Sequence, residues 1–171
     1  MELDGKKVAV LVEEDYEDQE LWYPYYRLQE AGAEVEFLGA GESTYESQYG
    51  YPCDVHYRVD HAIASNYDGV IVPGGYAPDR MRRYHPMVQF VREIGEAGGP
   101  CAAICHGGSM LISAGLVEGR RVTSHPSIRV DMENAGATWV DESVVRDGPV
   151  ITSRSSEDLP GLMREVIGAW E

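Results

Sequence analysis

The 171 residues, 43% of them hydrophobic and 25% charged, have the length and composition of one globular domain, spanning 1–171, with its own core. The formal net charge of −15 excludes the basic surface that nucleic acid or an anionic membrane needs. No apolar run approaches the roughly 20 residues that cross a bilayer, and the first residues lack the pattern of a signal peptide. Three cysteines without a framework spacing argue against disulfides. We therefore expect a cytoplasmic protein without nucleic-acid or membrane partners.

Short apolar runs alternate with amphipathic stretches along the chain. In chain order, the expected strands are 7–12, 34–38, 67–72, 101–104, 121–124 and 150–152, and the expected helices are 18–32, 78–98, 110–114, 128–135 and 157–170. Asp18 is expected to cap the first helix, and Pro24 to lie in its first turns or at a kink. Residues 39–60 predict an irregular excursion with a hairpin away from the main sheet. The alternation as a whole predicts a doubly wound α/β sandwich with a mostly parallel sheet.

The stretch at 101–112 carries the strongest functional signal. A buried strand breaks at Cys105-His106-Gly107 into a helix, which lifts the Cys105 thiol out of the sheet beside backbone N–H groups. A thiol at a helix N-terminus with a neighbouring histidine is in a setting that lowers the pKa of cysteine. We therefore expect Cys105 to be a nucleophile with a lowered pKa, although an internal cysteine can also be a small buried hydrophobic residue.

Other polar features follow the ends of other predicted strands. They are the acidic turn at 13–18 with Glu17, the glycines Gly74 and Gly75, and His125. Because ligands collect beyond the carboxyl ends of parallel strands, these groups are expected to meet Cys105 there. The N–H groups of Gly74, Gly75 and His106 would then form an oxyanion or carboxylate pocket, and His125 is expected to contact the substrate there.

Each of these features also has a purely structural interpretation. The two glycines alone are typical of a turn, His125 could cap or pack, and Glu17 could be an ordinary first-turn carboxylate. Ser127 is expected to cap the helix that follows it. Cys53 and His56 have a C-x-x-H spacing but too few further ligands for a metal site. No nucleotide-binding motif is present, so no metal and no cofactor are expected.

Several segments together resemble the PfpI-type intracellular peptidase and deglycase family of the glutamine-amidotransferase-like superfamily. They are YEDQEL at 16–21, PGG at 73–75, AICHG at 103–107, LISAG at 111–115 and TSHP at 123–126. The resemblance covers nearly the whole chain in order and spacing. It implies a single PfpI-like domain with a flavodoxin-like sandwich.

The resemblance also implies roles for individual residues. Cys105 would be the nucleophile, Glu17 would hydrogen-bond its sulfur, and His106 would be the general base. An acidic residue of a neighbouring subunit would orient His106, and the matching position in this chain is Asp79. The site would then be complete only in a homo-oligomer, a dimer or a hexamer. Aspartate is one methylene shorter than the glutamate familiar at that position, which puts this contact in question.

His125 stands where peptidase-like members often have tyrosine and the deglycase branch has histidine. We therefore expect a stress-related cysteine hydrolase or lyase, of the deglycase or glyoxalase III type, acting on reactive dicarbonyls or on glycated amines and thiols. An intracellular cysteine peptidase acting on a peptide substrate remains open. So does a non-enzymatic redox or stress sensor, in which Cys105 is oxidised to a sulfinate.

Overall fold

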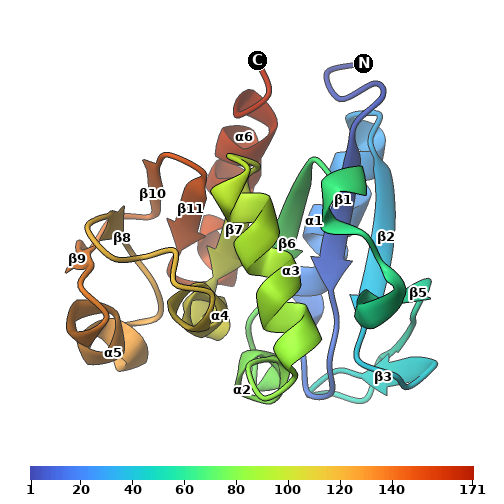
Figure 1. Cartoon of the computed structure of the whole chain (residues 1–171), viewed down its shortest axis with the longest axis horizontal. Helices are drawn as coiled ribbons and strands as arrows, with labels where there is room; N and C mark the ends of the chain where they lie inside the picture. Colours follow the sequence, from blue (N-terminus) through green and yellow to red (C-terminus); the bar gives the residue numbers. More distant parts are fainter.

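The computed structural model describes residues 1–171, and its centre is a seven-stranded sheet with the strand order β10-β11-β7-β6-β1-β2-β5 (Figure 1). Every neighbouring pair is parallel except the β10–β11 hairpin. The strands are β1 (Lys7–Leu11), β2 (Glu34–Gly39), β5 (Tyr57–Arg58), β6 (Gly69–Val72), β7 (Cys101–Ile104), β10 (Val144–Asp147) and β11 (Val150–Ser153). The apolar runs of β6 and β7 are buried along their whole length, as expected for strands covered on both faces.

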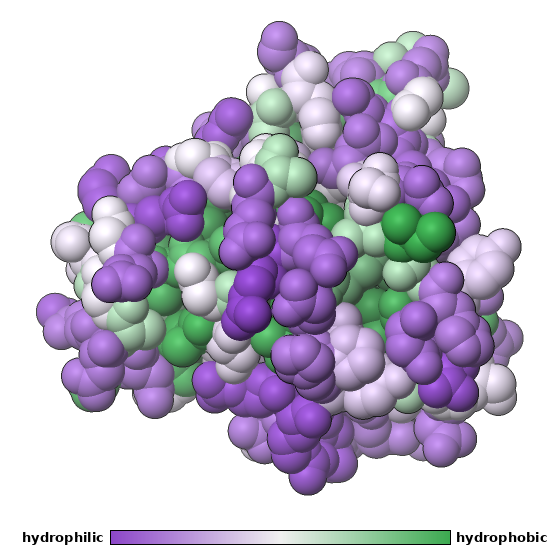
Figure 2. Space-filling view, in the orientation of Figure 1, coloured by the Kyte–Doolittle hydropathy of each residue, from purple (hydrophilic) through white to green (hydrophobic).

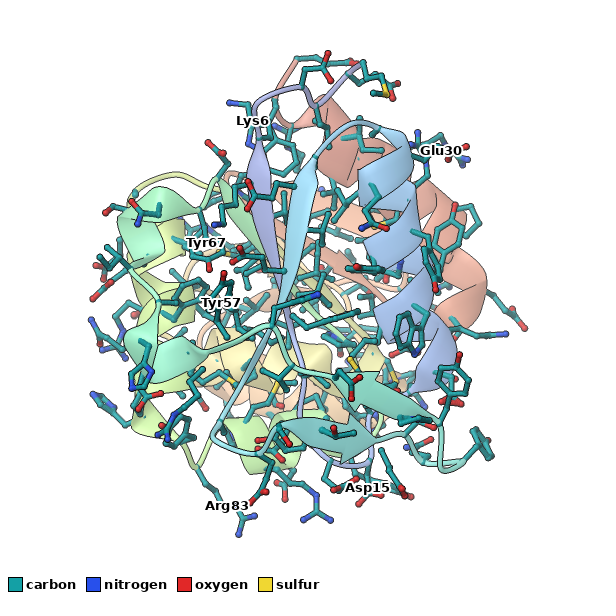
Figure 3. The ribbon with its side chains drawn as sticks, turned by 90° about the vertical axis from the view of Figure 1, so that its right-hand side faces the viewer. Lys6, Asp15, Glu30, Tyr57, Tyr67 and Arg83 are labelled. Carbon is teal, nitrogen blue, oxygen red and sulfur yellow. The ribbon has the colours of Figure 1, made fainter.

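Helices cover both faces of this sheet, which confirms the predicted doubly wound α/β sandwich. The helices are α1 (Asp18–Glu30), α2 (Ala77–Met81), α3 (His85–Glu96), α4 (Gly108–Ser113), α5 (Arg129–Asn134) and α6 (Leu159–Gly168). Helices α1 and α6 contact each other on one face, and α3 and α4 contact each other on the opposite face (Figures 1 and 3). The expected helix at 78–98 is divided into α2 and α3.

Two small sheets lie outside the main one. The hairpin of β3 (Thr44–Glu46) and β4 (Pro52–Asp54) confirms the excursion expected within 39–60, although β5 from the same stretch joins the main sheet. The strand expected at 121–124 forms over its first two residues as β8 (Arg121–Val122), which pairs only with β9 (Thr138–Trp139). It finds no place in the main sheet since β7 and β10 already occupy both edges of β11.

The N-cap of helix α1 lies one residue before the expected one. Glu17, not Asp18, is the N-cap residue, and its side chain accepts a hydrogen bond from the Glu20 N–H. Pro24 is buried at the end of the second turn of α1, as expected, and the helix continues past it to Glu30.

One continuous cluster of 47 buried hydrophobic residues fills the space between the sheet and the helices. No helix is long and apolar enough to cross a membrane. Hydrophilic residues dominate the face that α3 covers and gather along the lower edge in Figure 2. The carboxyl ends of the parallel strands lie at this edge, which Asp15 marks in Figure 3, opposite Lys6. The expected site residues are placed at this edge.

Candidate active site

Cys105 occupies a sharp turn between β7 and α4. Its φ angle of 58° is in the left-handed region, which a non-glycine residue adopts at a cost of about 1 kcal/mol. A one-turn 3-10 helix, Cys105–Gly107, starts there and leads into α4. The carbonyl of Cys105 accepts a hydrogen bond from the N–H of His125 at 3.2 Å, which ties a distant loop to the turn. The predicted strand–turn–helix elbow is therefore present, with a half-buried thiol at its apex.

Two histidines and a serine lie on one side of the sulfur. Nδ1 of His106 is 3.1 Å from Sγ of Cys105, and Nε2 of the same ring is 2.9 Å from Oγ of Ser127. The His125 ring stacks on the His106 ring with 4.6 Å between centroids. Burial, and then the neighbouring His125, lower the pKa of His106. At neutral pH, His106 is therefore an uncharged imidazole that can accept a proton.

Two carboxylates from the start of α1 lie on the other side. The Ser156 hydroxyl contacts both, at 3.2 Å from Glu17 and 2.8 Å from Glu20. Glu20 is only 2% exposed, and its Oε1 accepts the Gly74 N–H at 2.9 Å. Burial raises the pKa of Glu20 to about 7, and the charge of Glu17 adds to the rise. The hydrogen bonds of Glu17 go to the helix N-terminus and to Ser156, so the expected bond from Glu17 to the Cys105 sulfur is not formed in the single chain.

The pKa of Cys105 is raised to about 12, whereas the sequence predicted a lowered value. Burial is the largest cause and the negative charge of Glu20 the next, while the N–H groups of His106 and Gly75 act in the opposite direction. The sequence pattern indicates the helix start and the adjacent histidine, which lower the pKa of a thiol. It does not indicate that the α1 carboxylates lie close enough to raise that pKa. The resting sulfur is therefore a thiol, and its titration is coupled to that of the carboxylates.

Of the two glycines, only Gly75 keeps a free N–H near the sulfur. The N–H of Gly74 is bonded to Glu20 in the single chain, so it is not free to meet an oxyanion there. Gly75 has a φ of 78°, and a Cβ there would lie 2.6 Å from the Asp15 carbonyl oxygen. This contact requires glycine. The remaining donors around Sγ are the N–H groups of Gly75 and His106.

Asp79 lies on the short helix α2, which contacts the 3-10 turn that begins at Cys105. Asp79 is exposed, and its carboxylate makes no hydrogen bond or ion pair within the chain. The partner of His106 within the chain is Ser127 instead.

Three polar residues of the site were missed or misassigned from the sequence: Glu20, Ser127 and Ser156. Ser127 was expected to cap a helix, but α5 begins after Ile128 without a side-chain cap. The position of Ser127 two residues after His125 was the one sequence feature that could have indicated its place in the site. Nothing in the sequence indicated that Ser156 reaches α1.

The other two cysteines are not reactive candidates. Cys53 and Cys101 are fully buried, and burial raises the pKa of each to about 12. His56, the neighbour of Cys53 in the C-x-x-H spacing, accepts the Phe37 N–H through Nδ1. No group of three potential metal ligands is present.

Cys105 lies away from the larger cavities of the chain. The cavities of 430 to 490 Å³ lie elsewhere, one between Lys6 and Trp170 and others beside Tyr23 and Tyr26 on α1. Cys105 lines none of them.

Comparison with known sequences places this geometry in a family. The model of the DJ-1/PfpI family matches residues 6–169. The chain is 42% identical over 161 residues to Deglycase PH1704 of Pyrococcus horikoshii, covering 94% of this chain and 97% of that protein. It is 35% identical over 166 residues to Protein/nucleic acid deglycase 2 of Escherichia coli, covering 95% and 96%. It is also 38% identical over 170 residues to General stress protein 18 of Bacillus subtilis, covering 98% and 99%.

Solved structures agree with the fold. A two-domain protein of Anabaena variabilis with DJ-1/ThiJ/PfpI-like and ferritin-like domains matches with a TM-score of 0.92 and 42% identity over 95% of this chain. This chain covers 47% of that longer protein. DJ-1 of Schizosaccharomyces pombe matches with a TM-score of 0.86 and 20% identity, over 95% of this chain and 90% of its own. The resemblance noted in the sequence is confirmed, and the chain belongs to the DJ-1/PfpI family.

Proposed function

We propose that the protein is a cysteine-dependent hydrolase that acts on reactive dicarbonyls and on their early adducts with amines and thiols. The observation that carries the proposal is the contact of 3.1 Å between Sγ of Cys105 and Nδ1 of His106, at an elbow with a φ of 58°. The deglycase names of relatives that align over nearly their whole length support the same class of reaction.

In the proposed mechanism, Sγ of Cys105 adds to the aldehyde carbon of methylglyoxal while Nδ1 of His106 takes the thiol proton. The N–H groups of Gly75 and His106 stabilise the oxyanion, which is then protonated to give a hemithioacetal. The C1 proton leaves and a proton is added at C2, while the hydroxyl proton is lost from the C1 oxygen and one is gained at the C2 oxygen. This isomerisation converts the hemithioacetal into a thioester of lactate. Water hydrolyses the thioester and restores the thiol, so that methylglyoxal and one water yield lactate.

For a glycated amine, Sγ replaces the amine at the hemiaminal carbon, which is the former aldehyde carbon: the C–S bond forms, the C–N bond breaks and the amine leaves with the proton that the thiol gave up. The later steps are unchanged. The raised pKa of the thiol limits unproductive reaction, since the proton leaves only when His106 accepts it.

The test is to measure lactate from methylglyoxal, and free amine from methylglyoxal-treated N-acetyl-lysine, with purified protein. We expect Cys105→Ala to abolish both activities. Cys101→Ala is the matched control, since Cys101 is buried in the same segment and its side chain contacts only backbone carbonyls by hydrogen bonds. Wild-type activity equal to that of Cys105→Ala would overturn the proposal.

A redox sensor is the second candidate, and one observation favours it. The charges of Glu17 and Glu20 act on the Cys105 thiol, and burial raises the pKa of Glu20 to about 7, so a carboxyl that holds a proton near neutral pH lies close to an oxidisable sulfur. Intact mass after mild peroxide treatment tests this, with the gain of two oxygens expected only at Cys105. Oxidation spread over all three cysteines would count against it.

We also propose that the protein assembles as a dimer or hexamer in which Asp79 of one chain approaches the site of another. The support is an exposed carboxylate without an ion-pair partner on a helix that contacts the elbow. In such an assembly Asp79 adds to the contact from Ser127 rather than replacing it. Light scattering of the purified protein measures the oligomeric state.

A further inference from the structure

Ser127 stands between the two histidines of the site. Its Oγ is 2.9 Å from Nε2 of His106 and 2.8 Å from Nδ1 of His125, and its own N–H donates to the same Nδ1 at 3.1 Å. It lies in the 3-10 turn Pro126–Ile128 and does not cap the helix that follows. Its hydroxyl is therefore committed to the two rings.

The protons of this cluster can be counted. Nδ1 of His125 accepts the Ser127 N–H, so this nitrogen carries no proton of its own. The contact of 2.8 Å between Oγ and Nδ1 then requires the hydroxyl proton, because two lone pairs at that distance repel each other. The lone pairs of Oγ are left for His106, so Nε2 of His106 must carry a proton. In a neutral imidazole, Nδ1 of His106 is then unprotonated.

That unprotonated Nδ1 is the atom that lies 3.1 Å from Sγ of Cys105. The opposite tautomer would direct an N–H at the thiol and could not remove its proton. The structure holds His125 in place from two sides, through its N–H on the Cys105 carbonyl and through the stacking of its ring on His106 at an angle of 19°. Nδ1 of His125 is therefore a fixed acceptor for the Ser127 hydroxyl.

We propose that Ser127, held by His125, is a positioning residue that sets the tautomer of His106 so that Nδ1 serves as the base for Cys105. The proposal rests on the Cys105–His106 pair of the proposed function. It gives His125 a role beside His106, in addition to the substrate contact expected from the sequence. The orienting group that a neighbouring subunit was expected to supply is present within one chain.

The primary test measures the tautomer directly. In protein labelled with ¹⁵N-histidine, the two ring nitrogens of His106 are identified among the five histidines with a His106→Gln variant. We expect a protonated Nε2 and an unprotonated Nδ1 in the wild type, a mixture of tautomers in Ser127→Ala, and the wild-type pattern in Ser127→Thr, which keeps the hydroxyl. Ser65→Ala, which removes an exposed hydroxyl far from the site, should change nothing.

Methylglyoxal turnover gives the second readout. We expect kcat/KM to fall on the order of tenfold to hundredfold in Ser127→Ala and to return to within about threefold of the wild type in Ser127→Thr. An Nδ1–H tautomer in the wild type, or loss of activity in Ser127→Ala without a change of tautomer, would overturn the proposal. If the wild type is inactive towards carbonyls but the tautomers change as expected, the proposed function fails and the role of Ser127 stands.

Discussion

The two sides of the Cys105 sulfur have opposite chemistry. On the side of α1, Glu17 and Glu20 add negative charge, and Glu20 is one of the two largest causes of the raised pKa of the thiol. On the opposite side, His106 is kept uncharged by burial and by its neighbour His125, so that it can take a proton. The carboxylates therefore favour the protonated thiol, whereas His106 can accept the thiol proton.

The two sides also differ in how they are built. On the carboxylate side Glu20 is buried and bonded to the backbone of Gly74, whereas Glu17 is half-buried. On the histidine side His125 is half-buried and Ser127 is exposed, so a substrate can approach past Ser127 while Glu20 raises the pKa of the thiol from the buried side. Reactivity then depends on both sides keeping their positions relative to one elbow.

Separating the carboxylate side from the elbow should have the largest effect. Gly75→Ala places a Cβ 2.6 Å from the Asp15 carbonyl oxygen and the Glu17 N–H nitrogen, at a φ of 78°. We expect a loss of stability of about 1–3 kcal/mol and a fall in kcat/KM of about a hundredfold. Denaturation curves and methylglyoxal turnover measure the two effects.

Gly98→Ala is the matched control for this prediction. Gly98 also has a positive φ, of 86°, but nothing lies within 4 Å of its Cβ position. It should lose a little stability and keep full activity. Equal losses of activity in both variants would mean that the close approach at Gly75 is not needed.

Removing the charge of Glu20 should change stability in a pH-dependent way. Its pKa is about 7 in the folded protein against an ordinary 4.5, so the folded state holds the proton that the unfolded state releases. The contribution of Glu20 to the free energy of unfolding is fully present below pH 4.5 and is lost as the pH rises through about 7. Glu20→Gln stays neutral, so relative to the wild type it should gain up to about 3 kcal/mol at pH 8 and nothing below pH 4.5.

Denaturation at pH 4 and pH 8 measures this difference, with Glu30→Gln at the exposed end of the same helix as control. The same variant should let iodoacetamide alkylate Cys105 at a lower pH, because one cause of the raised thiol pKa is removed. A Glu20→Gln variant with the wild-type pH dependence would show that Glu20 is not the group that opposes ionisation of the thiol.

Asp79→Asn should have the smallest effect. Within one chain, Nε2 of His106 is already bonded to Ser127, so an acid from a second chain would contribute little to its orientation. We expect kcat/KM to change less than about threefold. A loss as large as that of Ser127→Ala would show that the intersubunit acid, rather than the serine, orients His106.

The elements of the fold could be predicted well because their causes are local. The runs of β6 and β7 are buried over their whole length, and that of β1 is buried after Lys7, as expected for strands covered on both faces. The predictions failed where the outcome depends on which other segment a residue or strand contacts. The segment at Arg121–Val122 has a strand pattern, but no edge of the main sheet was left for it. Glu17 replaced Asp18 as the cap because its carboxylate reaches the Glu20 N–H.

By itself, the sequence determined the order of strands and helices and the elbow that exposes Cys105 beside His106, because apolar periodicity and turn chemistry act between near neighbours. Only the tertiary structure decided the protonation of the site. Glu20 and Ser156 are 136 residues apart in the chain and meet beside the sulfur, and Ser127 reaches His106 across 21 residues. Burial and charge at such contacts set which atoms hold protons, and no local pattern carries that information.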